Sequence, residues 1–378
     1  MDFRNKKILI ARHGPFELNI KAYNCQEIGL AKELSKRGAY VDIVLYSHKN
    51  FIDEDTFKEY NIRIIYKKYI KIFYTGINIW LLNKKIKKSY DYIVSSEYNQ
   101  LMTFLLATPS NNIIMYNGPY YNTFRIKIFQ KVYDYICINR INKNIKYKFV
   151  KSVLAKEFLE KKGFTNISVL GVGFDPTNYL TKDEEIILDE NVEKKIEEFK
   201  KFIVISYIGS LDERKNFGFT INLIKNLIKS DDNFRFIIVG KGNDDYVKSK
   251  KILLSKDENK RILFIDELSN QNTKKIYNNS DFFILPSKLE IFGMVLLEAM
   301  YCKCFVISSY NGGSSTLIKN DYNGKIIENF DINEWTEYIN SKKNKKMREE
   351  ICENAHNTIK NYFLWNNIVD KIEREVFK

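Results

Sequence analysis

Short runs of apolar residues alternate along the chain with stretches in which apolar residues recur every three or four positions. The first run, Lys7–Ala11, is followed by a helical pattern over Cys25–Arg37 that ends at Gly38, and then by an apolar run at Val41–Leu45. A buried strand, an amphipathic helix and a second buried strand form a βαβ unit, which favours a parallel sheet. The same alternation predicts a helix at 152–162 and further strands at 62–66, 92–95, 113–116, 135–138, 147–150 and 167–170.

The alternation breaks at residues 183–191, an acidic stretch in which apolar residues follow no regular period. We place a domain boundary between residues 182 and 183, because 378 residues are long for one core and suit two domains. A second α/β domain is expected over 183–362. Its predicted elements are strands at 202–207, 234–239, 262–264, 281–285 and 305–309, and helices at 217–229, 271–279 and 343–362, with a last helix at 365–378.

Charge divides the chain into two unlike halves. Residues 1–180 contain 29 Lys and Arg against 15 Asp and Glu, whereas residues 181–378 contain 32 of each, so the net charge of +14 lies in the first half. This half suits an anionic partner such as lipid, a phosphorylated acceptor or nucleic acid. No nucleic-acid-binding motif accompanies the charge, and we expect no nucleic-acid partner.

The segment from Tyr60 to Tyr90 has no acidic residue and mixes lysines with aromatic and aliphatic residues. Such a mixture is typical of a segment that lies in a membrane surface, with its apolar face among the headgroups and its lysines on anionic lipid. An ordinary solvated face of a lysine-rich protein explains the same composition. The sequence leaves both interpretations open.

Neither a membrane span nor a metal site is predicted. No apolar run reaches the ~18 residues of a spanning helix, and the first residues resemble a lead into a strand rather than a signal peptide. Five scattered cysteines favour a reduced, cytoplasmic protein, peripheral at the inner face of the cell membrane if the basic segment binds lipid. Cys302 and Cys304 lack a second ligand pair, and the pair Asp53 and Asp55 belongs to an acidic surface loop, so we expect no metal.

Two carboxylates, Glu290 and Glu298, lie eight residues apart across Phe292-Gly293 and the apolar start of a helix. A strand that ends in Pro-Ser precedes this segment, and a second strand followed by Gly312-Gly313 comes after it. This βαβ arrangement favours anions and polyols at its mouth, where a helix N-terminus and carboxylates meet. One carboxylate can accept hydrogen bonds from the hydroxyls of one sugar, and the other from a second sugar.

Upstream, the loop Gly209–Asn216 follows a predicted strand and precedes a helix. Glycine permits close approach of the backbone to a ligand, and the cations Arg214 and Lys215 can neutralise phosphate. Gly240 and Gly242 mark another strand exit of the same kind.

The Glu290–Glu298 segment, with Leu285-Pro-Ser before it and Gly312-Gly313 after it, resembles the E-x7-E signature of retaining GT-B glycosyltransferases of family 4. The resemblance is dense over about 205–328 and covers the first domain only in outline. It implies an α/β chain with the GT-B fold, in which two Rossmann-like domains face across a cleft. It also implies that the helix at about 363–378 packs back on the N-terminal, acceptor-binding domain, while 183–362 binds the nucleotide sugar.

The resemblance further implies the roles of individual residues on the donor side. Glu290 would contact the transferred sugar and Glu298 the ribose hydroxyls, while Lys215 matches the family's phosphate-binding lysine. The family's arginine is Ser210 here, and Arg214 either supplies that cation or points to solvent. The remaining expected donor contacts are the backbone at Gly209, Gly240, Phe292, Gly293, Met294 and Val295, and Ile265 in the loop that packs the base.

On the acceptor side, Asn117 occupies what resembles the position of the family's histidine. An amide binds a sugar hydroxyl but cannot titrate, so any role that rests on imidazole is in doubt. His13 and Gly14 follow the first strand, and Glu97 ends another strand at the same edge of the sheet, where α/β proteins place ligands. We therefore name His13, Gly14, Glu97 and Asn117 as acceptor-side candidates, each of which can also be an ordinary loop or surface residue.

The resulting hypothesis is a retaining, metal-independent hexosyl- or related glycosyltransferase of cell-surface polysaccharide or glycolipid assembly. It moves a sugar from a nucleoside-diphosphate sugar, a co-substrate rather than a cofactor, to a hydroxyl of a saccharide or lipid-linked saccharide. Glu290, Lys215, Arg214 and Asn117 are its expected catalytic residues. Two alternatives stay open: a degenerate GT-B scaffold or binding subunit of a glycan-assembly complex, and a GT-B-fold nucleotide-sugar epimerase.

Overall fold

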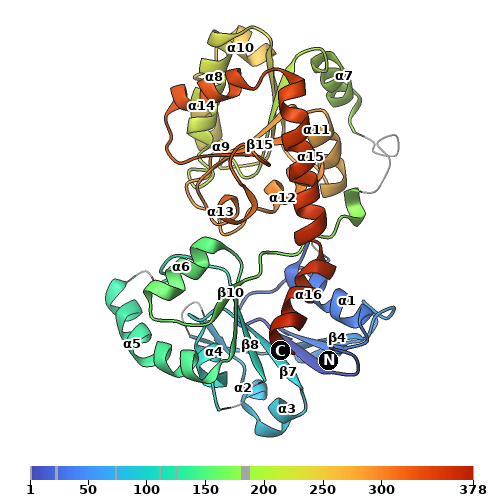
Figure 1. Cartoon of the computed structure of the whole chain (residues 1–378), viewed down its shortest axis with the longest axis vertical. Coiled ribbons are helices and arrows are strands. Elements are labelled where there is room, and N and C mark those ends of the chain that lie inside the picture. Colours follow the sequence, from blue (N-terminus) through green and yellow to red (C-terminus); the bar gives the residue numbers. More distant parts are fainter. Residues whose placement is uncertain are drawn as a thin grey trace. The chain divides into compact units, whose positions relative to one another are not determined.

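The computed structural model describes residues 2–21, 24–72, 75–109, 112–124, 126–179 and 188–377. The chain divides into two compact units (Figure 1): unit 1 is Met1–Asp175 with Phe363–Lys378, and unit 2 is Pro176–Tyr362. The boundary expected between residues 182 and 183 falls within 180–187, outside the described residues.

Unit 1 is built on one sheet with the strand order β10-β9-β8-β7-β1-β2-β4-β3, parallel except for β3 against β4. The buried apolar runs expected from the sequence form most of these strands, because side chains of a parallel sheet are covered on both faces. The strands are β1 (Lys7–Ala11), β2 (Tyr40–Tyr46), β3 (Phe51–Asp53), β4 (Ile62–Lys67), β7 (Tyr92–Ser96), β8 (Ile113–Asn117), β9 (Tyr147–Val150) and β10 (Ile167–Val169), with a separate hairpin of β5 (Ile70–Ile72) and β6 (Thr75–Ile77). The helices are α1 (Gln26–Lys36), α2 (Ile79–Leu82), α3 (Lys84–Lys88), α4 (Leu101–Leu106), α5 (Lys127–Asn144), α6 (Val153–Lys161) and α16 (Trp365–Val376).

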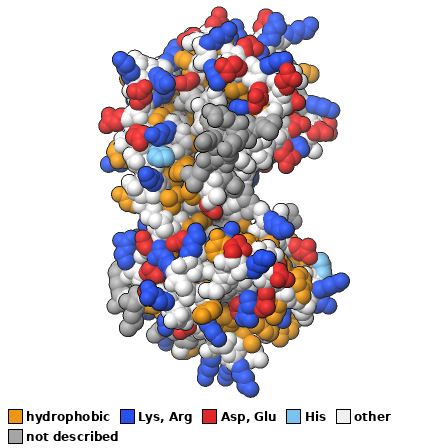
Figure 2. Space-filling model, turned by 90° about the vertical axis from the view of Figure 1, so that its right-hand side faces the viewer, with side chains coloured by type: hydrophobic (Ala, Val, Ile, Leu, Met, Phe, Trp, Pro, Cys, Tyr) orange, Lys and Arg blue, Asp and Glu red, His pale blue; other side chains and the backbone are white. Residues whose placement is uncertain are grey.

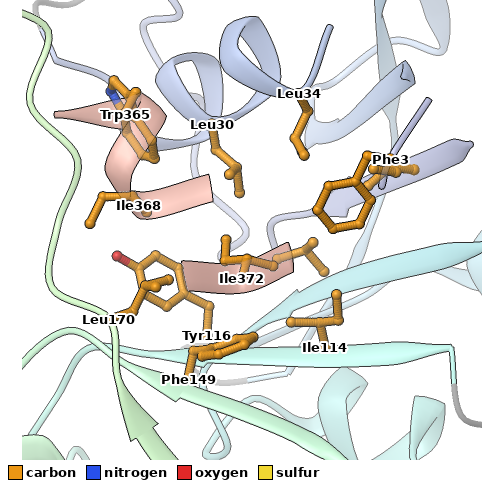
Figure 3. Close-up of a pocket in the computed structure, with 12 residues that line it drawn as sticks. Phe3, Leu30, Leu34, Ile114, Tyr116, Phe149, Leu170, Trp365, Ile368 and Ile372 are labelled. Carbon is orange, nitrogen blue, oxygen red and sulfur yellow. The ribbon is translucent and has the colours of Figure 1, made fainter. Parts of the chain in front are cut away.

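The last helix, α16, belongs to unit 1 although it follows the whole of unit 2 in the sequence. Figure 3 shows Trp365, Ile368 and Ile372 of this helix pointing toward α1 and the sheet. The indole of Trp365 lies so close to the backbone that a Cβ at Gly29 or Gly173 would come within 2.3 Å of it. Both positions therefore require glycine, and this close packing attaches α16 to unit 1.

Unit 2 contains a fully parallel sheet with the order β13-β12-β11-β14-β15-β16. Its core consists of the apolar faces of the strands and of the helix after β11, with Trp335 fully buried. The strands are β11 (Ile203–Ile208), β12 (Phe234–Val239), β13 (Ile262–Ile265), β14 (Phe282–Leu285), β15 (Phe305–Ser309) and β16 (Lys325–Ile327). The helices are η1 (Thr177–Tyr179), α7 (Glu190–Phe199), α8 (Phe217–Ser230), α9 (Asp244–Lys251), α10 (Lys256–Lys260), α11 (Asn270–Asn278), α12 (Met294–Tyr301), α13 (Ser314–Leu317), α14 (Ile332–Ser341) and α15 (Lys345–Tyr362).

One predicted strand, at 135–138, is wrong: these residues lie inside helix α5. Cys137 and Ile138 face the core, whereas Tyr135 and Ile136 are exposed. A short apolar run does not distinguish a buried strand from a helix segment by itself. Here both faces of the helix carry apolar residues, so the run lacks the polar positions that mark a helix.

Candidate active site

The candidate site of unit 2 lies where the order of the strands in its sheet reverses, next to β11. Strand β11 has β12 and β13 on one side and β14, β15 and β16 on the other, so the loops after β11 and β14 leave neighbouring strands at the same edge. Ligands of open α/β sheets bind at such switch points. A hydrogen bond connects the two loops: the backbone N–H of Lys288 donates to the carbonyl of Arg214 at 2.9 Å.

Lys215 and Glu290, which are 75 residues apart in the sequence, form an ion pair at this edge. Their side chains are 10% and 13% exposed, so water screens the pair only weakly. Asp212 fixes the loop by accepting a hydrogen bond from the backbone N–H of Lys215 at 2.7 Å and another from the hydroxyl of Ser210 at 2.7 Å. The cation and the carboxylate are therefore positioned together by the fold.

Arg214 lies at the rim of this pair. Its Nη1 is 3.6 Å from a carboxylate oxygen of Glu290 and donates to the carbonyl of Leu289 at 3.2 Å, while the side chain is 46% exposed. The guanidinium is thus held near the site with one side open to solvent. This geometry suits a second cation for a phosphate group.

Glycines let backbones approach one another closely on both sides of the pair. A Cβ on Gly240 would lie 1.8 Å from the carbonyl oxygen of Gly209, and a Cβ on Gly313 would lie 1.5 Å from that of Phe292. Gly293, with φ of +77°, precedes the first residue of α12 and turns the chain from the loop into the helix. The positive end of the α12 dipole therefore lies beside the Glu290 loop.

Glu298 lies within α12 and is buried. The hydroxyl of Tyr277 donates to its carboxylate at 3.0 Å. Burial raises the pKa of Glu298 to about 7, against the opposing effects of hydrogen bonds from Tyr277 and Tyr179 and of the charge of Lys215. Glu298 is thus poised to change its protonation state near neutral pH.

The other predicted donor-side residues surround these groups. The backbone N–H of Gly240 donates to the carbonyl of Ile265 at 2.9 Å, which ties the two strand exits together. Phe292 is buried, and Met294 and Val295 are half-buried at the start of α12.

In unit 1, a pocket of about 300 Å³ opens at the equivalent switch point, between β1 and β7. Gly14 and Glu97, two of the acceptor-side candidates, line it, and Glu97 has the unusual φ of +50°. Arg12, Glu27 and Lys151 also line this pocket, and Arg12 pairs with Glu27 at 3.0 Å.

The other two acceptor-side candidates are buried beside this edge rather than in the wall of the pocket. Nε2 of His13 is 2.7 Å from the hydroxyl of Ser95, and burial lowers the pKa of His13 to about 3, so the ring is neutral. The side chain of Asn117 accepts from the backbone N–H of Tyr98 at 3.2 Å and donates to the carbonyl of Pro119 at 3.0 Å. With these two hydrogen bonds, Asn117 connects the chain after β7 to the chain after β8, which is a structural role.

Three neighbours of the site were not among the predicted residues: two carry no signal in the sequence and one carries a weak signal. Tyr277 and Tyr179 reach Glu298 from α11 and η1, and neither belongs to a motif. Asp212 lies within the Gly209–Asn216 loop, where its spacing to Lys215 is typical of a side chain that accepts from the backbone three residues on. That spacing could have identified Asp212 as a residue that fixes the loop.

Across the described parts of the chain, no group of three or more His, Cys, Asp or Glu side chains is placed to hold a metal ion. Among the same residues, no helix has the length and apolarity needed to cross a membrane.

Comparison with known sequences gives a family match for unit 2. Residues 189–358 match the family described as glycosyl transferases group 1. The Staphylococcus aureus capsular polysaccharide biosynthesis glycosyltransferase CapM is 26% identical over 238 residues, which are 62% of this chain and 59% of that protein. A Campylobacter jejuni α-1,4-N-acetyl-D-galactosaminyltransferase that acts on an undecaprenol-diphosphate-linked saccharide is 29% identical over 131 residues, 34% of this chain and 35% of that protein. The chain thus matches less than two thirds of the length of these curated relatives.

Solved structures resemble the chain over nearly its whole length. Anabaena HepE in complex with UDP has a TM-score of 0.74 at 17% identity, covering 98% of this chain and 99% of that one. A trehalose-6-phosphate protein of Escherichia coli bound with UDP-2-fluoro glucose has a TM-score of 0.74 at 11% identity, with 98% of each chain covered. The expected fold class is confirmed: the chain has the GT-B fold, and residues 189–358 carry the sequence pattern of the group 1 glycosyl transferases.

Proposed function

We propose that this protein is a retaining glycosyltransferase of family 4 that moves a sugar from a nucleoside-diphosphate sugar to an acceptor hydroxyl. The observation that carries the proposal is the weakly exposed ion pair of Lys215 and Glu290 at the switch point of unit 2. A lysine there suits a diphosphate and a carboxylate suits sugar hydroxyls, and the group 1 match spans both residues.

The pair also suggests how the donor is bound. A diphosphate carries more negative charge than one carboxylate, so it would compete with Glu290 for Lys215. Glu290 would then accept hydrogen bonds from the transferred sugar. Arg214 and the N-terminus of α12 would stabilise the charge that develops on the departing diphosphate.

Retention is proposed to follow from positioning rather than from a covalent nucleophile. The acceptor hydroxyl would approach from the face that the diphosphate leaves, with the departing phosphate accepting its proton. The bond from the anomeric carbon to the phosphate oxygen breaks, and a bond to the acceptor oxygen forms. No metal enters this scheme, because Lys215 and Arg214 supply the positive charge.

The acceptor is proposed to be a saccharide or a lipid-linked saccharide of cell-surface polysaccharide or glycolipid assembly. CapM and the Campylobacter enzyme support this class by the reactions in their names. The pocket of unit 1, with Arg12, Glu97 and Lys151 in its wall, offers hydrogen-bonding groups suited to an acceptor. A cytoplasmic protein that binds the membrane surface peripherally would meet such lipid-linked substrates.

The test is incubation of the purified protein with a panel of nucleotide sugars and candidate acceptors, with and without EDTA. The proposal predicts release of nucleoside diphosphate and a product whose anomeric configuration, read by NMR, is that of the donor, at the same rate in EDTA. An inverted product would refute retention, and loss of the reaction in EDTA would refute metal independence. A changed sugar on an intact nucleotide would favour the epimerase, and binding without any turnover would favour the scaffold.

A further inference from the structure

Helix α5 presents an apolar face to solvent. Ile128, Val132, Tyr135 and Ile136 follow the spacing of one helix face, and Phe129 continues it. Tyr135 is 87% exposed and Ile128 is 58% exposed, and the others are also exposed. The opposite face, with Cys137, Ile138 and Ile141, packs in the core of unit 1. Exposed apolar side chains gathered on one surface mark an interaction site.

The same face is basic. Lys127, Lys131 and Lys143 are exposed on α5 and flank its apolar residues. The single acid of the helix, Asp134, is half-buried and is paired with Lys162 and with the side-chain amide of Gln130. The exposed surface of α5 therefore combines apolar side chains with positive charge.

The basic segment from Tyr60 to Tyr90 is a weaker candidate for such a surface. It folds as strands β4, β5 and β6 with the short helices α2 and α3, and Ile65, Tyr69 and Leu81 are buried. Among its described residues, the large apolar side chains that are exposed are Ile70 and Ile79, fewer than the five on α5. Figure 2 shows lysine and arginine side chains at the lower tip of unit 1. The lysines of this segment attract anions, but its described residues expose less apolar surface than α5 does.

We propose that α5 is the element by which this protein lies on an anionic lipid bilayer, with Ile128, Phe129, Val132, Tyr135 and Ile136 among the headgroups. Apolar side chains enter the boundary between headgroups and acyl chains, while flanking lysines bind anionic lipid. The net charge of +14, all of it in the first half of the chain, complements that surface. The inference deepens the membrane location proposed above, on which it rests, and is independent of sugar transfer.

A second copy of the chain fits this face less well. If two copies met through α5, Lys127, Lys131 and Lys143 of each would lie close to those of the other, with no exposed acid on the helix to compensate them. Like charges across an interface oppose association. Anionic lipid removes that repulsion, because it brings the opposite charge.

The test compares two variants of the full chain in co-sedimentation with phosphatidylglycerol-containing and pure phosphatidylcholine vesicles. In the α5 variant, Ile128, Val132, Tyr135 and Ile136 become Ser. In the matched control, four exposed apolar residues of unit 2 become Ser: Ile252, Leu253, Tyr322 and Met347. We expect the wild type to bind anionic vesicles selectively, the α5 variant to bind at least about tenfold more weakly, and the control to bind as the wild type does.

Insertion is measured separately with tryptophan probes. Tyr135→Trp should be quenched by brominated lipid, whereas Ile252→Trp, at a position 82% exposed in unit 2, should not be. Equal vesicle binding by the wild type and the α5 variant, or an unquenched Tyr135→Trp that still sediments with vesicles, would overturn the inference. A wild-type dimer that the α5 variant converts to monomer would overturn it in favour of a second copy.

Sugar transfer is read in parallel with a soluble acceptor, so that the two proposals fail separately. The α5 variant should keep the wild-type rate, because its changed residues lie outside both candidate sites. A protein that transfers sugar but never binds vesicles would refute the membrane contact alone. One that binds vesicles through α5 without transfer would refute only the catalytic proposal.

Discussion

Replacing Lys215 by Ala should weaken the binding of nucleoside diphosphate, because the proposed contact is present in both the donor and the product. A hydrogen bond to a charged partner contributes about 1.5–3 kcal/mol when water screens it weakly. Lys215 is 10% exposed, so its contribution should lie toward the upper end. A loss of about 2.7 kcal/mol corresponds to ~100-fold weaker binding.

Part of this loss should come from Glu290 rather than from the missing lysine. In the wild type, Glu290 is paired with Lys215 and is 13% exposed. Without the lysine, its carboxylate lies next to the more distant charge of Arg214, at 3.6 Å, and repels the diphosphate more strongly than the paired carboxylate does. The double variant Lys215→Ala/Glu290→Gln should therefore bind about tenfold more tightly than Lys215→Ala alone, since neutralising the carboxylate removes that repulsion.

Isothermal titration calorimetry with UDP and GDP, without acceptor, measures these differences. Lys288→Ala is the matched control, because Lys288 forms an ion pair with Glu213 at 3.0 Å in the neighbouring loop but is 50% exposed. It should bind nucleotide within about twofold of the wild type, as expected for an exposed pair. Unchanged affinity in Lys215→Ala would remove this lysine from the site and leave Arg214 as the phosphate ligand.

Three further perturbations test the site and its support. Glu290→Ala should lower kcat/KM by about 10²-fold or more with the melting temperature little changed, and near-wild-type turnover would refute the proposed sugar contact. Gly313→Ala should lower the free energy of unfolding in urea by about 3 kcal/mol, because its Cβ would lie 1.5 Å from the carbonyl oxygen of Phe292. Gly218→Ala should be tolerated, because its Cβ would meet the flexible end of Lys250 at 3.4 Å and the hydroxyl of Tyr246 at 3.7 Å; equal stability of the two variants would contradict the close packing. The pKa of Glu298, about 7 in the folded protein and near 4.5 when unfolded, means that the folded state holds its proton more tightly and loses that stability as pH rises through this window. Glu298→Gln should therefore gain about 2 kcal/mol of stability relative to the wild type between pH 5 and pH 8, and parallel pH profiles would show that Glu298 ionises normally.

The hydrophobic pattern predicts most of the strands because a parallel sheet is buried on both faces, which leaves apolar runs such as Lys7–Ala11 in the sequence. The pattern predicted a strand at 135–138 where the structure has a helix. The exposed face of α5 is apolar there, so the sequence lacks the polar residues that normally mark the solvent side of a helix. The same feature makes α5 a candidate membrane surface. Only burial in the folded unit separates the apolar residues that fill the core from those that remain outside.

The candidate donor site was predictable where chemistry and local spacing coincide. Glu290, Gly293 and Glu298 occupy one loop and one helix, so their relation is fixed by a few residues of chain. The ion pair of Glu290 with Lys215 was beyond the sequence, because 75 residues and the order of β11 and β14 in the sheet separate the partners.

Tertiary structure also decided the state of each titrating group. The sequence indicates His13 and Glu298 as candidate site residues. It does not predict that both are buried, or that the hydroxyl of Tyr277 donates a hydrogen bond to the carboxylate of Glu298. Burial penalises the charged form of each, which lowers the pKa of the histidine and raises that of the glutamate. Residue type and order thus determined which chemical groups are available, whereas long-range packing determined their partners and their charge.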